Sequence, residues 1–148
     1  MITFSNLQNH QIETITSMME DFYAIDNYPI DLETTKKLFQ EFISDENLGK
    51  CWLIFMDDEI VGYFILTFIF SFEYKGRIAF LDELFIKEKH QGKGIGKEVL
   101  AFIKVQIPKL SLKLLYLEVE HHNENAQKLY IANGFENHNR KLLKYKIL

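Results

Sequence analysis

The strongest chemical feature of the 148-residue chain is a glycine-rich turn. Three of the chain's seven glycines fall within five residues, in the segment Gln91-Gly92-Lys93-Gly94-Ile95-Gly96-Lys97. Closely spaced glycines let the backbone curl tightly and expose successive N–H groups. The turn follows an expected strand and opens an expected helix, so its amides and the positive end of the helix dipole would bind phosphate oxygens. A turn that serves only for chain reversal is the alternative.

Two common phosphate-binding motifs do not fit this turn. The dinucleotide fingerprint G-x-G-x-x-G needs its third glycine one residue later than Gly96. The Walker loop needs Ser or Thr after Gly-Lys, but Gly96-Lys97 is followed by Glu98, which leaves no magnesium-binding hydroxyl. A third kind of phosphate site is therefore indicated.

A second patterned segment lies further along the chain. Its characteristic residues are Asn123, Ala126, Tyr130, Gly134 and Phe135. Together with the turn, it resembles the GNAT superfamily of acyl-CoA-dependent N-acetyltransferases, whose signatures are [Gln/Arg]-x-x-Gly-x-[Gly/Ala] and Asn-x-x-Ala-x-x-x-Tyr-x-x-x-Gly-Phe. The first signature is matched by Gln91, Gly94 and Gly96. The resemblance covers about residues 62–135 and matches the first 60 residues only in the order of their elements.

The resemblance implies that acetyl-CoA is the cosubstrate and that no metal is needed. The amides of residues 91–97 would hold its pyrophosphate. The pantetheine arm would insert like an extra strand between two splayed strands, against the edges Leu84–Ile86 and Leu117–Val119. A main-chain amide near Phe85 or Ile86 would polarise the thioester carbonyl. In the second segment, Asn123 and Ala126 are expected to contact the cofactor.

The implied reaction is direct attack of an amine through a tetrahedral intermediate. An aliphatic amine has a pKa of about 10.4, so it must lose a proton before it attacks. Glu83 and Asp82 are the candidate general bases. Strand alternation points them to opposite faces, and we favour Glu83. The alternative is a carboxylate that pairs with Arg77 or with a lysine.

The resemblance places a general acid at Tyr130. A phenol that is neutral at pH 7 can donate a proton to the departing coenzyme A thiolate. The alternative is a helix tyrosine that packs under the last expected strand.

The first two expected helices would shape the acceptor pocket. Tyr23, Asp26 and Tyr28 lie in their connection and could hold a cationic amine by charge and cation–π contact. The expected acceptor is a small cationic amine such as a polyamine, an aminoglycoside or a lysine-like compound; solvated helix acids are the alternative. A non-catalytic acyl-CoA-binding module and a protein or peptide N-acetyltransferase remain open as other functions.

The charge pattern agrees with one site for an anionic cofactor and another for a cationic amine. The net charge is −4, but residues 1–60 carry 12 acids and 3 bases, whereas residues 61–148 carry 9 acids and 14 bases. A net acidic chain argues against nucleic acid as the partner. The longest apolar run, Ile60–Phe72, is too short for a membrane helix, and no secretory signal is visible. Cys51 is the lone cysteine, so we expect a cytoplasmic protein without disulfides; homodimers are common in the family.

The pattern of apolar residues predicts the elements that must position these side chains. Expected strands are Ile2–Phe4, Cys51–Met56, Ile60–Phe72, Ile78–Ile86, Leu114–Val119 and Leu142–Ile147. Expected helices run from about Ile12 to before Asn27, from a cap at Asp31 to Ser44, from about Gly94 to Ile107, and from Glu124 to Ala132. The fold class is therefore α/β (α+β), a single domain over residues 1–148. The resemblance implies a GNAT-like mixed sheet of six to seven strands with about four helices, strands 4 and 5 being splayed.

Overall fold

The computed structural model describes residues 1–147, which divide into two compact units at Glu118 and Val119. The first unit contains a sheet in the order β1-β2-β3-β4-β5. Its strands are β1 (Ile2–Asn6), β2 (Gly49–Met56), β3 (Glu59–Ser71), β4 (Gly76–Ile86) and β5 (Leu115–Leu117). Its helices are α1 (Ile12–Ile25), α2 (Leu32–Ser44) and α3 (Ile95–Lys109), with 3₁₀ turns η1 (Asn9–Gln11) and η2 (Glu88–His90). The second unit contains α4 (Glu124–Ala132).

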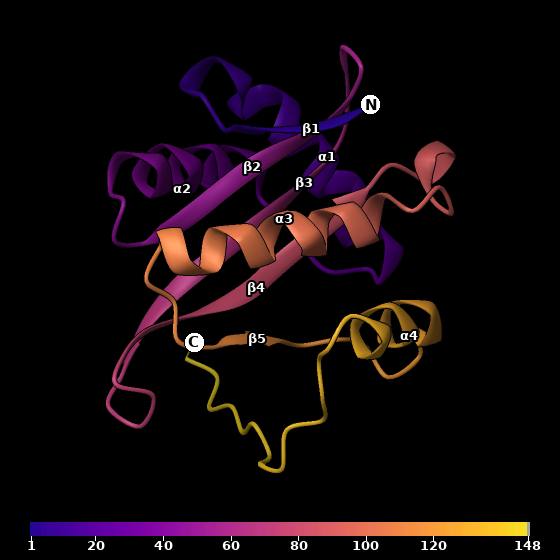
Figure 1. The fold of residues 1–148 in the computed structure, drawn as a ribbon. Helices are drawn as coiled ribbons and strands as arrows, with labels where there is room; N and C mark the ends of the chain where they lie inside the picture. Colours follow the sequence, from indigo (N-terminus) through magenta and orange to yellow (C-terminus); the bar gives the residue numbers. More distant parts are fainter. Residues whose placement is uncertain (148) are drawn as a thin grey trace. The chain divides into compact units, whose positions relative to one another are not determined.

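The sheet of the first unit is covered on both faces, and α3 crosses one of them (Figure 1). Successive strand residues point to opposite faces, so neighbours in β2 and β3 enter different cores. On the α3 face, Trp52 stacks on Phe64 at 5.1 Å, and Phe102 of α3 meets Trp52 edge-on at 5.5 Å. The other core joins the strands to α1 and α2 through Ile15, Met18, Phe39, Leu53 and Tyr63. The two cores fix the sheet between its helices.

Capping residues fix the starts of α2 and α4, and the cap at Asp31 is the predicted one. Asp31 accepts a hydrogen bond from the Thr34 amide at 3.0 Å, which starts α2. In the second unit, the Asn123 side chain accepts one from the Ala126 amide at 3.1 Å, which starts α4. Gly134 follows α4 with a φ of 98°, a value that glycine adopts without strain.

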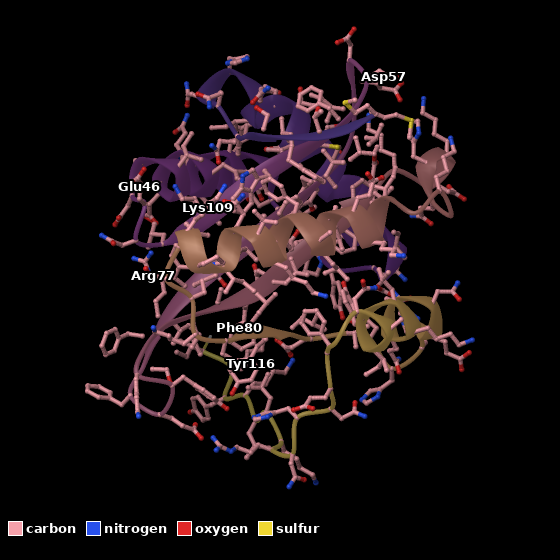
Figure 2. The ribbon with its side chains drawn as sticks, viewed as in Figure 1. Glu46, Asp57, Arg77, Phe80, Lys109 and Tyr116 are labelled. Carbon is pink, nitrogen blue, oxygen red and sulfur yellow. The ribbon has the colours of Figure 1, made fainter. Side chains whose placement is uncertain are left out.

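Strand β4 carries two irregularities that matter for the site. β3 pairs antiparallel with β4, but Ile65 faces Glu83 while Leu66 faces Leu81, so Asp82 is an extra residue in a β-bulge. On its other side, β4 pairs in parallel with β5 only over Ala79–Leu81. The rings of Phe80 and Tyr116, both labelled in Figure 2, pack across this short ladder at 5.3 Å. The ladder ends at Leu81 and Leu117, where β5 itself ends, so the part of β4 beyond Leu81 has no β5 residue opposite it.

Two expectations are corrected by the fold. The sheet has five strands, not six to seven, because the described residues 141–147 form no strand. A strand needs a neighbour that accepts and donates its backbone hydrogen bonds, and here Leu142, Leu143 and Tyr145 stay exposed. The third helix does not end before Pro108 but continues to Lys109. The last turn still closes there, because the Leu110 amide donates to the Gln106 carbonyl at 2.9 Å.

Candidate active site

The favoured general base, Glu83, lies inside a cluster of aromatic side chains on the α1 and α2 face of the sheet. Its Oε2 accepts a hydrogen bond from the Tyr23 hydroxyl at 2.6 Å, and its Oε1 accepts one from the Tyr63 hydroxyl at 2.7 Å. Phe22 and Phe85 pack beside these rings, with centroids 5.4 Å apart. The carboxylate is therefore held by two phenols from different elements, α1 and β3.

The bulge separates the two candidate carboxylates. As the extra residue, Asp82 is exposed, whereas Glu83 enters the aromatic cluster. The alternative partner for these carboxylates, Arg77, is used elsewhere: its guanidinium lies 4.4 Å from the ring centre of Phe68 and donates to Asn47. Glu83 thus pairs with phenols, not with a cation.

Burial controls the acid–base properties of this cluster. Desolvation raises the pKa of Glu83, an effect that the phenol hydrogen bonds partly offset and the negative charge of Asp82 reinforces. Desolvation and the nearby Glu83 also raise the pKa of Tyr23 and of Tyr63, so both phenols stay protonated at neutral pH. Cys51 is buried and burial raises the pKa of its thiol, which fits a core residue, not a nucleophile. A carboxylate with a raised pKa is a better proton acceptor from an amine than an ordinary one.

The residues expected to receive the acceptor lie at the end of α1. Tyr28 folds back so that its amide donates to the Tyr23 carbonyl at 2.9 Å, and the two rings are 6.5 Å apart. Asp26 is the residue that ends α1, and it is half-buried. The structure brings Tyr23 and Tyr28 together and joins Tyr23 to Glu83.

Beyond Leu81, the edge of β4 turned away from β3 has no paired strand among residues 1–147. The Lys87 amide donates to the Val61 carbonyl of β3 at 2.8 Å, and alternate residues of a strand point their amides the same way. The Phe85 amide therefore faces β3, and the amides of Leu84 and Ile86 face the open edge. Of the two amides proposed to polarise a carbonyl, the geometry favours that of Ile86.

The glycine turn has the geometry of an anion site. Gly92 and Gly94 have φ values of 77° and 80°, and a Cβ on either residue would meet no atom within 4 Å. Gly94 is the N-cap of α3 and has no side chain that could accept a hydrogen bond. The first N–H groups of the helix are therefore available to a ligand. The residues present therefore fit a phosphate group. The Gln91 side chain closes the loop by donating to the Ile86 carbonyl at 2.9 Å.

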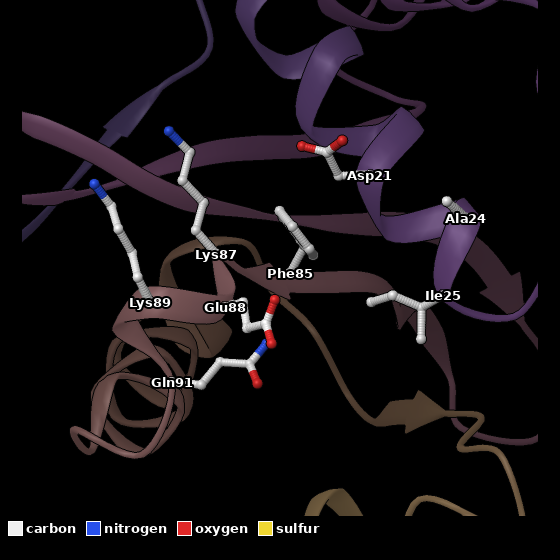
Figure 3. A pocket seen from close by; sticks show the side chains of 8 residues that line it. All are labelled: Asp21, Ala24, Ile25, Phe85, Lys87, Glu88, Lys89 and Gln91. Carbon is white, nitrogen blue, oxygen red and sulfur yellow. The ribbon is translucent and has the colours of Figure 1, made fainter.

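An open pocket of about 980 Å³ connects α1 to the segment between β4 and the glycine turn (Figure 3). Asp21, Ala24 and Ile25 line it from α1. Phe85, Lys87, Glu88, Lys89 and Gln91 line it from the other side. The pocket thus lies beside both the end of the free edge and the start of the turn, and it carries charges of both signs.

The residues of the second signature lie in the second unit. Asn123 and Ala126 are joined by the cap of α4, so their spacing has a structural explanation. The Tyr130 ring packs against Phe135 at 5.6 Å, and the Phe135 amide donates to the Tyr130 carbonyl at 3.1 Å. Burial raises the pKa of Tyr130, which keeps the phenol protonated as a general acid requires.

Sequence reasoning missed Tyr63. In the sequence, Tyr63 is one of many apolar residues of a strand. Its contact with Glu83 follows only from the β3–β4 register, in which Ile65 faces Glu83 and Tyr63 lies diagonally across from it. Among residues 1–147, no group of three or more acidic, His or Cys side chains could hold a metal ion. Within the same residues, each helix is too short or too polar to cross a membrane.

Comparisons with known proteins identify the family. The Acetyltransferase (GNAT) family profile matches residues 13–135, so the chain belongs to the GNAT acetyltransferase family.

Individual relatives carry related descriptions. The Bacillus subtilis spermine/spermidine N(1)-acetyltransferase is 30% identical over 78% of each chain. The uncharacterized N-acetyltransferase YhfO of the same organism is 36% identical over 53% of this chain, and the match spans about half of that relative, 52%. Among solved structures, an integron cassette protein from the mobile metagenome of Cole Harbour Salt Marsh is 27% identical. It superposes with a TM-score of 0.88 over 98% of this chain and 90% of that protein.

Proposed function

We propose that this chain transfers an acetyl group from acetyl-CoA to a primary amine of a small cationic acceptor. The observation that carries the proposal is the position of Glu83, which lies two residues beyond the last β4–β5 pair, next to the edge that leads into the glycine turn. A half-buried carboxylate beside an open strand edge and an anion site is the arrangement that acyl transfer to an amine needs. The family profile spans both units, which supports a single acetyltransferase domain over residues 1–148.

The glycine turn and the β4 edge are the parts that would hold acetyl-CoA. The amides of residues 92–97 and the charges of Lys93 and Lys97 suit its pyrophosphate. The outward amides of Leu84 and Ile86 suit the arm, with Asn123 and Ala126 as further contacts. Acetyl-CoA supplies the acetyl group in an activated thioester.

Glu83 is proposed to take the proton that the acceptor must lose. Most of an aliphatic amine is protonated at neutral pH, so the raised pKa of Glu83 brings base and amine closer in proton affinity. Tyr130 is proposed as the general acid that protonates the leaving thiolate, since burial keeps its phenol protonated.

Charge at the acceptor side supports a cationic substrate. The Tyr28 ring lies beside that of Tyr23, Asp26 caps the end of α1, and Asp21 lines the pocket next to α1. Carboxylates and aromatic faces together bind ammonium groups. A relative described as acting on spermine and spermidine makes aliphatic polyamines the first acceptors to test.

The test compares 1,4-diaminobutane with 1-aminobutane, which share a primary amine and chain length but differ in the second ammonium. Free-thiol release from acetyl-CoA and mass spectrometry of the product measure transfer. We expect kcat/KM to be about two- to fivefold higher for the diamine, the effect of one ion pair of up to about 1 kcal/mol at a partly exposed site. Equal values would contradict the cationic acceptor. Transfer to peptides but not to either amine would show that the acceptor is a peptide and not a small cationic amine.

A further inference from the structure

The two phenols that hold Glu83 differ in their freedom to move. Tyr63 is fully buried, with 0% of its surface exposed, and its ring packs against Phe22 and Phe85 at 6.5 and 5.8 Å. It lies in the middle of β3, which is hydrogen-bonded on both sides by β2 and β4. Tyr63 therefore cannot leave Glu83 without opening the sheet.

Tyr23 lies on the opposite side of the carboxylate. It is half-buried, sits in the last turn and a half of α1, and its ring is 6.5 Å from Tyr28. Its hydroxyl donates to Oε2 of Glu83 from α1, the helix that borders the expected acceptor side. An acceptor held near Tyr28 would thus meet the Tyr23 hydroxyl before it meets Glu83.

We infer, resting on the proposed function, that Tyr63 is a positioning residue that fixes Glu83, and that Tyr23 is the catalytic residue through which the proton of the acceptor reaches Glu83. In this step an N–H bond of the ammonium breaks and its proton passes to the Tyr23 oxygen. The Tyr23 O–H bond breaks at the same time, and that proton passes to Oε2 of Glu83. The products are a neutral amine, an intact phenol and a carboxylic acid, so charge and protons balance.

The surroundings of Glu83 favour a concerted relay. The titratable groups that face it are Tyr23 of α1, Tyr63 of β3, Cys51 of β2 and Asp82 of its own strand. The raised pKa of the Tyr23 phenol makes a free phenolate unfavourable, so its proton must leave as another arrives. Both hydrogen bonds favour the ionised form of Glu83, whereas burial and Asp82 oppose it.

The test is the pH dependence of kcat/KM for diamine acetylation in wild type, Tyr63→Phe and Tyr23→Phe. A base must be ionised, so activity rises with pH through the pKa of Glu83. Removing one phenol donor raises that pKa, and the acid limb should move up by about one pH unit in either variant. Tyr23→Phe should also lower kcat on the plateau above the limb by about 10²-fold. Tyr63→Phe should keep its plateau kcat within about threefold, because the base stays in place when ionised.

The control is Tyr74→Phe, a half-buried tyrosine in the turn between β3 and β4, which should behave as wild type. An unmoved acid limb in Tyr63→Phe would overturn its positioning role, and a full plateau rate in Tyr23→Phe would overturn the relay. A ¹³C NMR titration of the Glu83 carboxyl gives a readout that does not depend on turnover, and its midpoint should rise in Tyr63→Phe. If wild type transfers no acetyl group to any acceptor, the proposed function and the relay both fall. The NMR midpoint then still decides whether Tyr63 holds Glu83.

Discussion

Glu83→Gln is the substitution that separates chemistry from structure in this site. Glutamine keeps the size of the side chain but cannot take up a proton from an amine. The Tyr23 and Tyr63 hydroxyls, now 2.6 and 2.7 Å from the carboxylate oxygens, would then face a neutral amide. Folding and coenzyme A binding should persist, because the glycine turn and the β4 edge do not depend on the charge of Glu83.

The expected loss follows from the role of the base. Positioned general acid–base groups contribute about 10²- to 10⁴-fold to a rate, so Glu83→Gln should lower kcat by at least about 10²-fold at neutral pH. Glu83→Asp should also be slow. It withdraws the carboxylate by about 1.5 Å, one carbon–carbon bond, and neither phenol hydrogen bond can then keep its length.

The assay is thiol release at saturating acetyl-CoA and amine, with coenzyme A affinity measured by calorimetry. Asp82→Asn is the matched comparison, since it removes the neighbouring carboxylate from an exposed bulge position. We expect it to change kcat by less than about tenfold and to lower the acid limb slightly, because the charge of Asp82 raises the pKa of Glu83. The choice of base is refuted if Glu83→Gln retains a third or more of wild-type kcat, or if Asp82→Asn loses more.

Three further predictions concern the rest of the chain. Tyr130→Phe should lower thiol release by about 10²-fold while coenzyme A affinity, measured by calorimetry, stays within about twofold; an equal loss of both would make Tyr130 a binding residue. Gly62→Ala should lower the free energy of unfolding in urea by about 1–3 kcal/mol, because its Cβ would lie 2.1 Å from the Phe85 carbonyl oxygen, and wild-type stability would refute this close β3–β4 approach. Burial raises the pKa of Glu83 above the ordinary value of 4.5, so wild type loses stability as pH rises above that value, whereas Glu83→Gln has no such titration. The free energy of unfolding of Glu83→Gln minus that of wild type should therefore increase with pH above 4.5, and a constant difference would contradict the sign.

Much of the fold follows from local patterns in the sequence. The helix cap at Asp31 and the glycine that follows α4 depend on short-range hydrogen bonds and on backbone freedom, which the residue types reveal. The prediction for residues 142–147 is wrong for a related reason. Alternation shows that a segment could be a strand, but not that a neighbouring strand is present to pair with it.

The site was predictable only in part. The glycine turn could be recognised from the sequence, because the positive φ values of Gly92 and Gly94 belong to backbone conformations that favour glycine. The bulge at Asp82 could not be foreseen, since it arises from the register between β3 and β4 and not from either strand alone. Tyr63 was missed for the same reason. Its contact with Glu83 depends on the pairing of residues 20 positions apart, which one sequence does not disclose.

The measurement that tests the central claim most directly is a turnover experiment with purified protein, acetyl-CoA and 1,4-diaminobutane, read by thiol release and by the mass of the amine. We predict monoacetylated diamine and free coenzyme A in equal amounts, with both lost in Glu83→Gln. Tight coenzyme A binding without thiol release, across amines and peptides alike, would contradict acetyl transfer and leave a non-catalytic acyl-CoA-binding module.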